Sequence, residues 1–209
     1  MKTRIISLLA LAIALIAMWS CHAGGTAYDA DTKEGYAEAV KLILKSVDPA
    51  TEKVYYMKFE CSQEHGNRLE TLTIKVVSDK DMAYSLKILL TGNCQALPME
   101  HLPHTFEAPI YKNVKGIDIT HFDADKVLDQ INQDKKLIPE GGKFKAIYDY
   151  TISESVPAGD EAFNDTEEIG KVTTSFFLSF FQKDSNGQEA FAAVRCLVDP
   201  QNNKVSFDR

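Results

Sequence analysis

The sequence lacks the short motifs that mark most catalytic and phosphate-binding sites. It contains no G-x-S-x-G, S-x-x-K or H-E-x-x-H pattern and no glycine-rich phosphate-binding pattern. These absences remove the common signatures of activated nucleophiles, zinc peptidases and nucleotide-binding enzymes. Catalytic residues can also lie scattered along a chain, so an enzyme with a scattered site stays as an alternative. We predict no cofactor and no metal site.

Positive charge is scarce as well. The chain has 23 Lys and Arg against 30 Asp and Glu, a formal net charge of −7, and no basic run. An acidic protein repels phosphate backbones, so we predict no nucleic-acid partner. A hydrophobic content of 44% is ordinary for a folded protein and argues against a disordered chain.

Cysteine is used only four times, and no two cysteines form a C-x-x-C pair. Zinc-ribbon and dithiol redox motifs are therefore absent. If Cys21 is modified, at most one disulfide can form among the other three cysteines. We predict a bridge between Cys61 and Cys94, which lie in the same half of the chain. Cys61 and Cys196 also lie in strand-like runs, where a free cysteine packs as a small apolar side chain.

One long apolar run is present, and it lies at the start of the chain. Ile5–Trp19 follows Lys2 and Arg4, the layout of a secretory signal, and is short for a membrane span. The run ends in Ser20-Cys21. This small residue before a cysteine resembles the lipobox of bacterial lipoproteins.

The resemblance implies that residues 1–20 are a signal peptide and that Cys21 carries acyl chains such as palmitate. Residues 21–32 would then be a lipid-anchored tether that joins the protein to a membrane. The absence of Asp at position 22 and of a following acidic cluster implies an outer-membrane lipoprotein of the cell envelope, facing the periplasm. The alternatives are a secreted protein cleaved after Ala23 and an uncleaved anchor.

The body, residues 33–209, begins with a predicted helix. Five apolar residues recur at helical spacing in a segment that Asp31 would cap and that Asp48-Pro49 ends: Tyr36, Val40, Ile43, Leu44 and Val47. Alternating apolar residues then predict three strands, over 55–61, 72–76 and 82–90.

The second half shows a similar order. A short strand is predicted at 116–120, and a helix over 124–131 that Asp123 would cap. Strands follow over 144–152, 172–182 and 189–198, the last two joined by an Asn186-Gly187 turn, and 204–207 would add an edge strand.

This order predicts an α+β fold with helices packed on antiparallel sheet, organised as two helix–strand–strand–strand units in tandem. The corresponding subunits are 33–112 and 116–209. The order is similar to that of cystatin-like domains and of tandem-unit β-lactamase inhibitory proteins in topology alone, and this similarity implies no functional residue.

Four phenylalanines place aromatic rings on both faces of one predicted strand: Phe176, Phe177, Phe180 and Phe181. A strand that is apolar on both faces is buried on both faces, which favours a core position. The alternative is that one face lines a pocket.

An acidic loop between residues 154 and 170 is the predicted binding segment. It contains no basic residue, and its candidate binding residues are Asp160, Glu161, Asp165, Glu167 and Glu168. Its spacing does not match an EF-hand loop, so we favour a solvated loop, with calcium binding and a basic protein partner as the alternatives. Together these features predict a non-catalytic envelope lipoprotein that binds a protein or peptide, as an inhibitor or immunity factor does. A carrier of a small ligand or lipid in an apolar cavity and an envelope enzyme are the alternatives.

Overall fold

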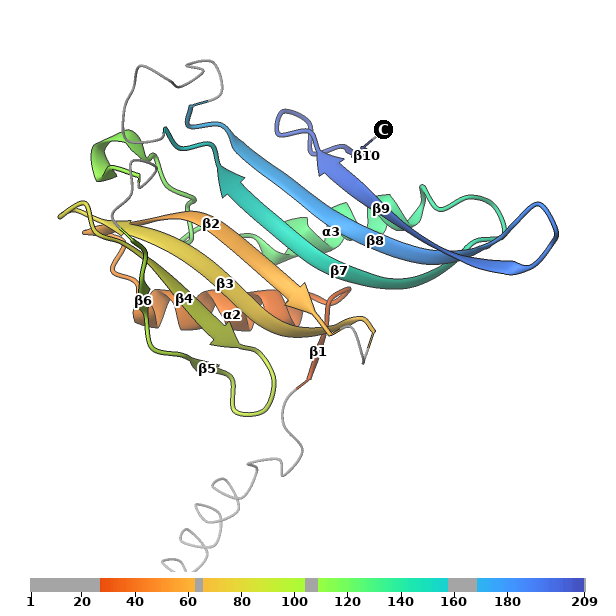
Figure 1. Ribbon diagram of the computed structural model, residues 1–209, viewed down its shortest axis with the longest axis horizontal. Coiled ribbons are helices and arrows are strands. Elements are labelled where there is room, and N and C mark those ends of the chain that lie inside the picture. Colours follow the sequence, from red (N-terminus) through yellow and green to blue (C-terminus); the bar gives the residue numbers. More distant parts are fainter. Residues whose placement is uncertain (1–26, 63–65, 104–108, 158–168, 209) are drawn as a thin grey trace, which may run out of the picture.

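One antiparallel sheet runs through both halves of the chain in the computed structural model (Figure 1). The structure describes residues 27–62, 66–103, 109–157 and 169–208. The strands follow the order β10-β9-β8-β7-β2-β3-β4-β5, with β1 paired to β3 and β6 paired to β4. The strands before the middle loop are β1 (Tyr28–Asp29), β2 (Glu52–Cys61), β3 (Arg68–Ser78), β4 (Ala83–Leu89), β5 (Gln95–Ala96) and β6 (Glu100–His101). Those after it are β7 (Lys143–Glu154), β8 (Val172–Lys183), β9 (Glu189–Val198) and β10 (Val205–Phe207).

Two α-helices and one short 3₁₀ helix complete the described structure: α2 (Lys33–Ser46), α3 (Ala124–Lys135) and η1 (Tyr111–Asn113). Asp123 caps α3 as predicted, since its carboxylate accepts the backbone N–H groups of Asp125 and Lys126. Asp31 does not cap α2. The N-cap residue is Thr32, which makes no side-chain capping bond.

The predicted α+β fold, with helices packed on antiparallel sheet in two tandem units, is wrong. The structure is mostly antiparallel sheet: 44% of the described residues lie in strands and 18% in two short helices and the 3₁₀ turn. β2 and β7 pair directly, from Tyr56 opposite Ser153 to Glu60 opposite Asp149. Each of these strands would otherwise leave a row of unpaired backbone groups, so their pairing joins the two predicted units into one sheet.

The predicted strand at 116–120 is also wrong. This segment makes one backbone hydrogen bond to β2, from Ile117 N to Val54 O, and then turns at Asp118. The other predicted strands and both helices are present, with bounds that differ by a few residues at most ends. The division into 33–112 and 116–209 stays a prediction, although the sheet is continuous across it.

The core lies on one face of the sheet, which we call the inner face. The larger of two clusters of buried side chains includes residues of β2, β3, β4, β7, β8 and β9 together with residues of both helices, and the smaller contains Tyr55, Val77 and Val114. At the centre of the larger cluster the Tyr36 ring of α2 lies 4.8 Å from the Phe59 ring, and the Tyr150 ring lies 5.6 Å from the Phe176 ring. The Tyr150 ring also lies 5.9 Å from the Tyr36 ring and 6.3 Å from the Phe59 ring, so aromatic contacts join the two halves of the chain.

The helix α2 approaches the sheet closely at Gly35. A Cβ atom at this position would lie 2.6 Å from both Leu69 Cδ1 and Tyr28 Cβ. Only a residue without a side chain permits this approach. None of the helices in the described residues is long and apolar enough to cross a membrane.

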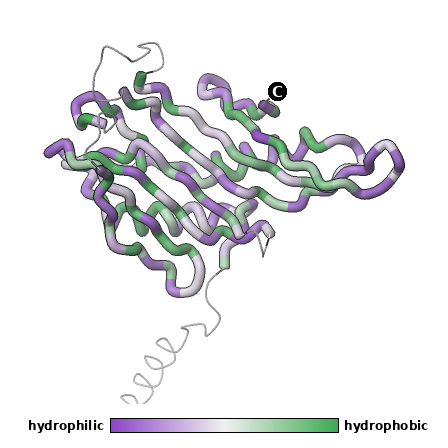
Figure 2. Tube along the Cα trace, viewed as in Figure 1, coloured by the Kyte–Doolittle hydropathy of each residue, from purple (hydrophilic) through white to green (hydrophobic). Residues whose placement is uncertain are grey.

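The opposite face of the sheet, the outer face, carries the alternate residues of the same strands. Figure 1 looks onto this face, with α3 behind the strands. Hydrophilic and hydrophobic positions accordingly alternate along the chain, and the tip of the β8–β9 hairpin is hydrophilic (Figure 2). The phenylalanines of β8 divide between the faces: Phe176 and Phe180 are buried in the core, whereas Phe177 is 39% exposed. The prediction that both faces of this strand are buried is therefore wrong.

Candidate binding site on the outer face of the sheet

A cleft of about 560 Å³ opens on the outer face, where the two halves of the chain meet. This volume lies within the range of roughly 300–1,000 Å³ that is typical of ligand sites. Three neighbouring strands, β2, β7 and β8, supply its lining residues: Lys58, Glu60, Cys61, Tyr148, Asp149 and Phe177.

Strand register explains why these residues meet. Glu60 lies opposite Asp149 across the β2–β7 pair, and Asp149 lies opposite Phe177 across the β7–β8 pair. The β7–β8 register shifts between Ile147 and Asp149. The extra residue in this bulge is Tyr148, and a bulge re-aims the side chains beside it. Tyr148 and Asp149 therefore both reach the cleft, although they are neighbours in a strand.

One ammonium group is shared by two carboxylates in the cleft. Lys58 Nζ lies 2.9 Å from Glu60 Oε1 and 3.7 Å from Asp149 Oδ2. The hydrogen bond to Glu60, more than any other interaction, raises the pKa of Lys58. Burial raises the pKa of Asp149, and the nearby Glu60 raises it further, while Lys58 and Arg195 oppose this. By formal charge, Lys58, Glu60 and Asp149 together sum to −1.

The Cys61 thiol, which lines the cleft, is poorly suited to act as a nucleophile. Cys61 is 8% exposed, and burial raises its pKa well above the ordinary value. Four carboxylates near the thiol raise this pKa further: Asp149, Glu70, Asp31 and Glu60. A protonated thiol in an acidic environment does not attack an electrophile. No group of three or more His, Cys, Asp or Glu side chains within the described ranges could hold a metal ion.

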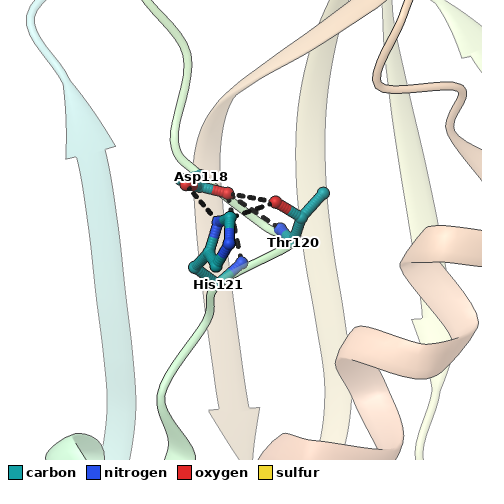
Figure 3. Close-up of polar contacts among 3 residues, drawn as sticks. All are labelled: Asp118, Thr120 and His121. Carbon is teal, nitrogen blue, oxygen red and sulfur yellow. Dashed lines mark hydrogen bonds and ion pairs between the residues drawn. The ribbon is translucent and has the colours of Figure 1, made fainter.

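A second polar cluster lies in the turn before α3 (Figure 3). Asp118 Oδ1 accepts hydrogen bonds from the hydroxyl and backbone N–H of Thr120 and from His121 N, while Asp118 Oδ2 lies 2.8 Å from His121 Nδ1. The Thr120 hydrogen bond, followed by His121, lowers the pKa of Asp118 to about 2.

This cluster superficially resembles a catalytic triad, but its connectivity is different. The Thr120 hydroxyl lies 3.0 Å from His121 Nδ1, the same ring nitrogen that faces Asp118. A triad requires the carboxylate and the hydroxyl on opposite ring nitrogens, so that the imidazole can take a proton from one while the other orients it. The cluster is therefore a turn held by an aspartate side chain.

A smaller cavity of about 370 Å³ lies beside this turn, lined in part by Lys53, Lys115 and Gly116. Its polar groups bind the protein's own loop. Lys53 Nζ donates to the backbone oxygens of Tyr111 and Val114, and buried Glu154 accepts the backbone N–H groups of Lys115 and Gly116. These bonds attach the middle loop to β2 and β7, which is a structural role.

Most of the site residues predicted from the sequence stay predictions. Cys21 and the acidic-loop residues Asp160, Glu161, Asp165, Glu167 and Glu168 lie outside the described residues. The predicted Cys61–Cys94 disulfide is not formed, because both residues are free cysteines, as is Cys196. Cys61 lies on β2 and Cys94 follows β4, with β3 between them.

Sequence reasoning missed the charged residues of the cleft. Their only signal was that Lys58 and Glu60 alternate with apolar residues in one predicted strand, as Asp149 does in another. That pattern places each residue on a polar face but does not say which strands are neighbours. Comparisons with protein-family models, with curated proteins and with solved structures found no match.

Proposed function

We propose that this protein is a non-catalytic binding module of the bacterial envelope, anchored through a lipid at Cys21, whose outer-face cleft holds a basic side chain of a protein or peptide partner. The observation that carries the proposal is the cleft itself. It contains two carboxylates, Glu60 and Asp149, that share the single ammonium of Lys58, and two aromatic side chains flank them.

The charge of the cleft supports a cationic ligand group. Glu60 and Asp149 exceed Lys58 by one negative charge, and the Arg195 guanidinium nearby is 3.6 Å from Asp208. A lysine or arginine of the partner would balance this excess through charge-assisted hydrogen bonds, which are stronger than neutral ones. The partly buried position of Asp149, whose side chain is 22% exposed, lessens solvent screening of such a pair.

The aromatic side chains add a second recognition element. Phe177 is 39% exposed, and Tyr148 lines the same cleft. Aromatic faces attract ammonium and guanidinium groups, and Lys145 already makes such contacts with the neighbouring Phe181 and Phe191 rings. Carboxylates beside aromatic rings suit a long basic side chain, whose stem is apolar and whose end is charged.

A lipid or apolar ligand suits this cleft less well. Its lining includes Lys58, Glu60 and Asp149, and covering them with a hydrocarbon chain would remove charged groups from water without replacing their hydration. A protein or peptide partner can supply the polar groups that such a surface requires.

Fluorescent peptides test the proposal. Two sets of decapeptides would be compared by fluorescence anisotropy, identical except for lysine or arginine at the centre of one set and glutamate or glutamine in the other. We expect the basic set to bind more tightly. The double variant Glu60→Gln with Asp149→Asn should weaken its binding at least about tenfold, the effect of losing one or two charge-assisted bonds.

The matched control is Glu34→Gln with Glu140→Gln, which makes the same charge change at two exposed sites outside the cleft. This control should bind the basic peptides nearly as well as the unmodified protein. Equal binding of basic and acidic peptides, or equal losses in the cleft variant and the control, would show that the cleft is not the binding site.

A further inference from the structure

The β9 edge of the sheet is open along most of its length. β10 pairs with β9 only from Val198 to Cys196, and the last bond between these segments runs from Asp208 N to Arg195 O. No other described strand pairs with this side of β9, whose opposite side pairs with β8 along its full length.

The backbone groups along this edge can be assigned from the same bonds. Asp199 N donates to Lys204 O and Arg195 O accepts from Asp208 N, so the odd-numbered residues of β9 direct their backbone groups away from β8. The N–H and C=O groups of Glu189, Phe191 and Ala193 therefore point outward from the sheet. In the described part of the chain no protein group bonds to them on that side.

This edge lacks two of the features that prevent strand pairing, a proline and a bulge. β9 contains no proline, and its register with β8 shows no shift from Glu189 to Val198. The opposite edge differs, because β4 is covered at Ile88 and Leu89 by β5, and at Tyr84 and Ser85 by β6. A long, regular edge strand with apolar side chains is a template for another strand.

We propose that a second copy of this chain pairs with the open β9 edge, antiparallel and centred on Phe191, and so joins two sheets into one. The open segment has the correct length for this register. The β8–β9 hairpin limits it at one end, and Asp208 limits it at the other. Centring the pair on Phe191 places Glu189 opposite Ala193 of the second copy, so every outward backbone group of these three residues gains a partner.

Side chains of the edge are complementary to themselves in this register. The Phe191 side chain is 50% exposed. Its ring lies 6.0 Å from the Phe181 ring, and Lys145 Nζ lies 4.9 Å from the centre of the Phe191 ring. Across the two-fold axis Phe191 meets its equivalent, and cross-strand aromatic pairs stabilise antiparallel sheets. Glu189 lies diagonally across from Arg195 of the second copy, within reach of two long side chains of opposite charge.

The two-fold axis of such a pair is perpendicular to the sheet. Both outer faces then lie on the same side of the joined sheet, so the two clefts face one direction. The pairing uses the backbone of β9 and side chains that do not themselves line the cleft, although the Phe191 ring lies 6.3 Å from the ring of Tyr148, which does.

Sedimentation equilibrium of the full-length protein in non-ionic detergent, between about 1 and 100 µM, tests the proposal. We expect a reversible monomer–dimer equilibrium. Phe191→Lys should weaken dimerisation at least about tenfold, because a lysine at the centre of an edge opposes strand pairing. Leu197→Lys is the control, because it also places a lysine in β9. Leu197 is 37% exposed and lies where β10 already covers the edge. It should leave the dimer intact.

Two further measurements separate strand pairing from other association. Hydrogen exchange at the Phe191 and Ala193 amides should slow as the protein concentration rises. Glu189→Arg should weaken the dimer, and adding Arg195→Glu should restore it. A monomer at all concentrations, or a dimer that Phe191→Lys leaves unchanged, would overturn the proposal. Protection of these amides only when another protein is added would equally overturn it, by making that protein the occupant of the edge.

Discussion

The carboxyl group of Asp134 lies in the core, and neutralising it should stabilise the protein at neutral pH. Its side chain is fully buried at the end of α3, one oxygen has no hydrogen-bond partner, and the other accepts a bond from Cys196 Sγ at 3.0 Å. Burial raises the pKa of Asp134 from 3.8 to about 6, and the Cys196 hydrogen bond opposes this rise. The neutral acid is therefore the form that the folded protein favours.

The sign of the pH dependence follows from this shift. A carboxyl group whose pKa is raised in the folded state contributes its full stability below the unfolded pKa of 3.8 and loses it as the pH rises through about 6. Each pKa unit corresponds to about 1.36 kcal/mol, so the shift corresponds to a loss of about 3 kcal/mol at neutral pH. This is a large fraction of the stability of a typical domain.

Asp134→Asn removes the titration and keeps an oxygen that can accept the Cys196 bond. Urea unfolding followed by circular dichroism would compare the variant with the unmodified protein at about pH 4 and about pH 7.5. The difference in free energy of unfolding, variant minus unmodified, should rise by about 2.4 kcal/mol between these pH values, because a small part of the loss has already occurred at about pH 4. A pH-independent effect of the amide on the free energy of unfolding cancels when the two pH values are compared. The contribution of other titrating groups such as Asp149 cancels when the variant is compared with the unmodified protein.

Asp129→Asn is the matched control, since Asp129 is an exposed aspartate on the same helix. Its stability should follow that of the unmodified protein at both pH values. If Asp134→Asn also followed the unmodified protein at both pH values, the Asp134 carboxyl group would not be buried in the folded state as described.

Three further outcomes follow from the same structure and sequence. Gly35→Ala should lower the free energy of unfolding by about 1–3 kcal/mol, because its Cβ would lie 2.6 Å from Leu69 and Tyr28, whereas Ala37→Ser on the same helix should have little effect in the same urea titration. Iodoacetamide should label Cys94 in the native protein, and it should label the buried Cys61 and Cys196 only after unfolding, as mass spectrometry would show. An unreactive Cys94 in unfolded protein that has not been reduced would instead indicate a disulfide. Cys21→Ala should abolish incorporation of radiolabelled palmitate and release the protein from membranes, and equal labelling of this variant would exclude a lipid at Cys21.

Local patterns in the sequence predicted local structure well. Asp123 stands one residue before an apolar helical stripe, and its carboxylate caps α3 as this position predicts. Asp31 stands in a similar position before α2 but instead pairs with Lys135 at 2.7 Å. Lys135 is far away in the sequence, and no pattern near Asp31 indicates the pairing. A tertiary contact thus replaced the local one.

The same limit explains the fold and the cleft. Alternation in β2 and β7 correctly predicted two strands with one polar face each, but strand neighbours depend on contacts that are distant in the sequence. A reader of the sequence who does not know the β2–β7 pair predicts two separate units. In those units nothing places Glu60 beside Asp149, so the cleft is not predicted. The bulge that brings Tyr148 beside Asp149 likewise has no signal in residue types alone.

The pairing of β2 with β7 also has a consequence for how the protein folds. The paired residues are roughly 90 positions apart, so this closure carries a large loop entropy and is expected to be a slow step. During synthesis, β2, β3 and β4 can form before β7 has left the ribosome, and β2 then presents a bare edge to any other chain. A fragment ending before β7 should therefore aggregate, while the complete chain should fold in a late step that depends on β7. The β2–β7 pair, which lies in the middle of the sheet, is therefore expected to form last during folding.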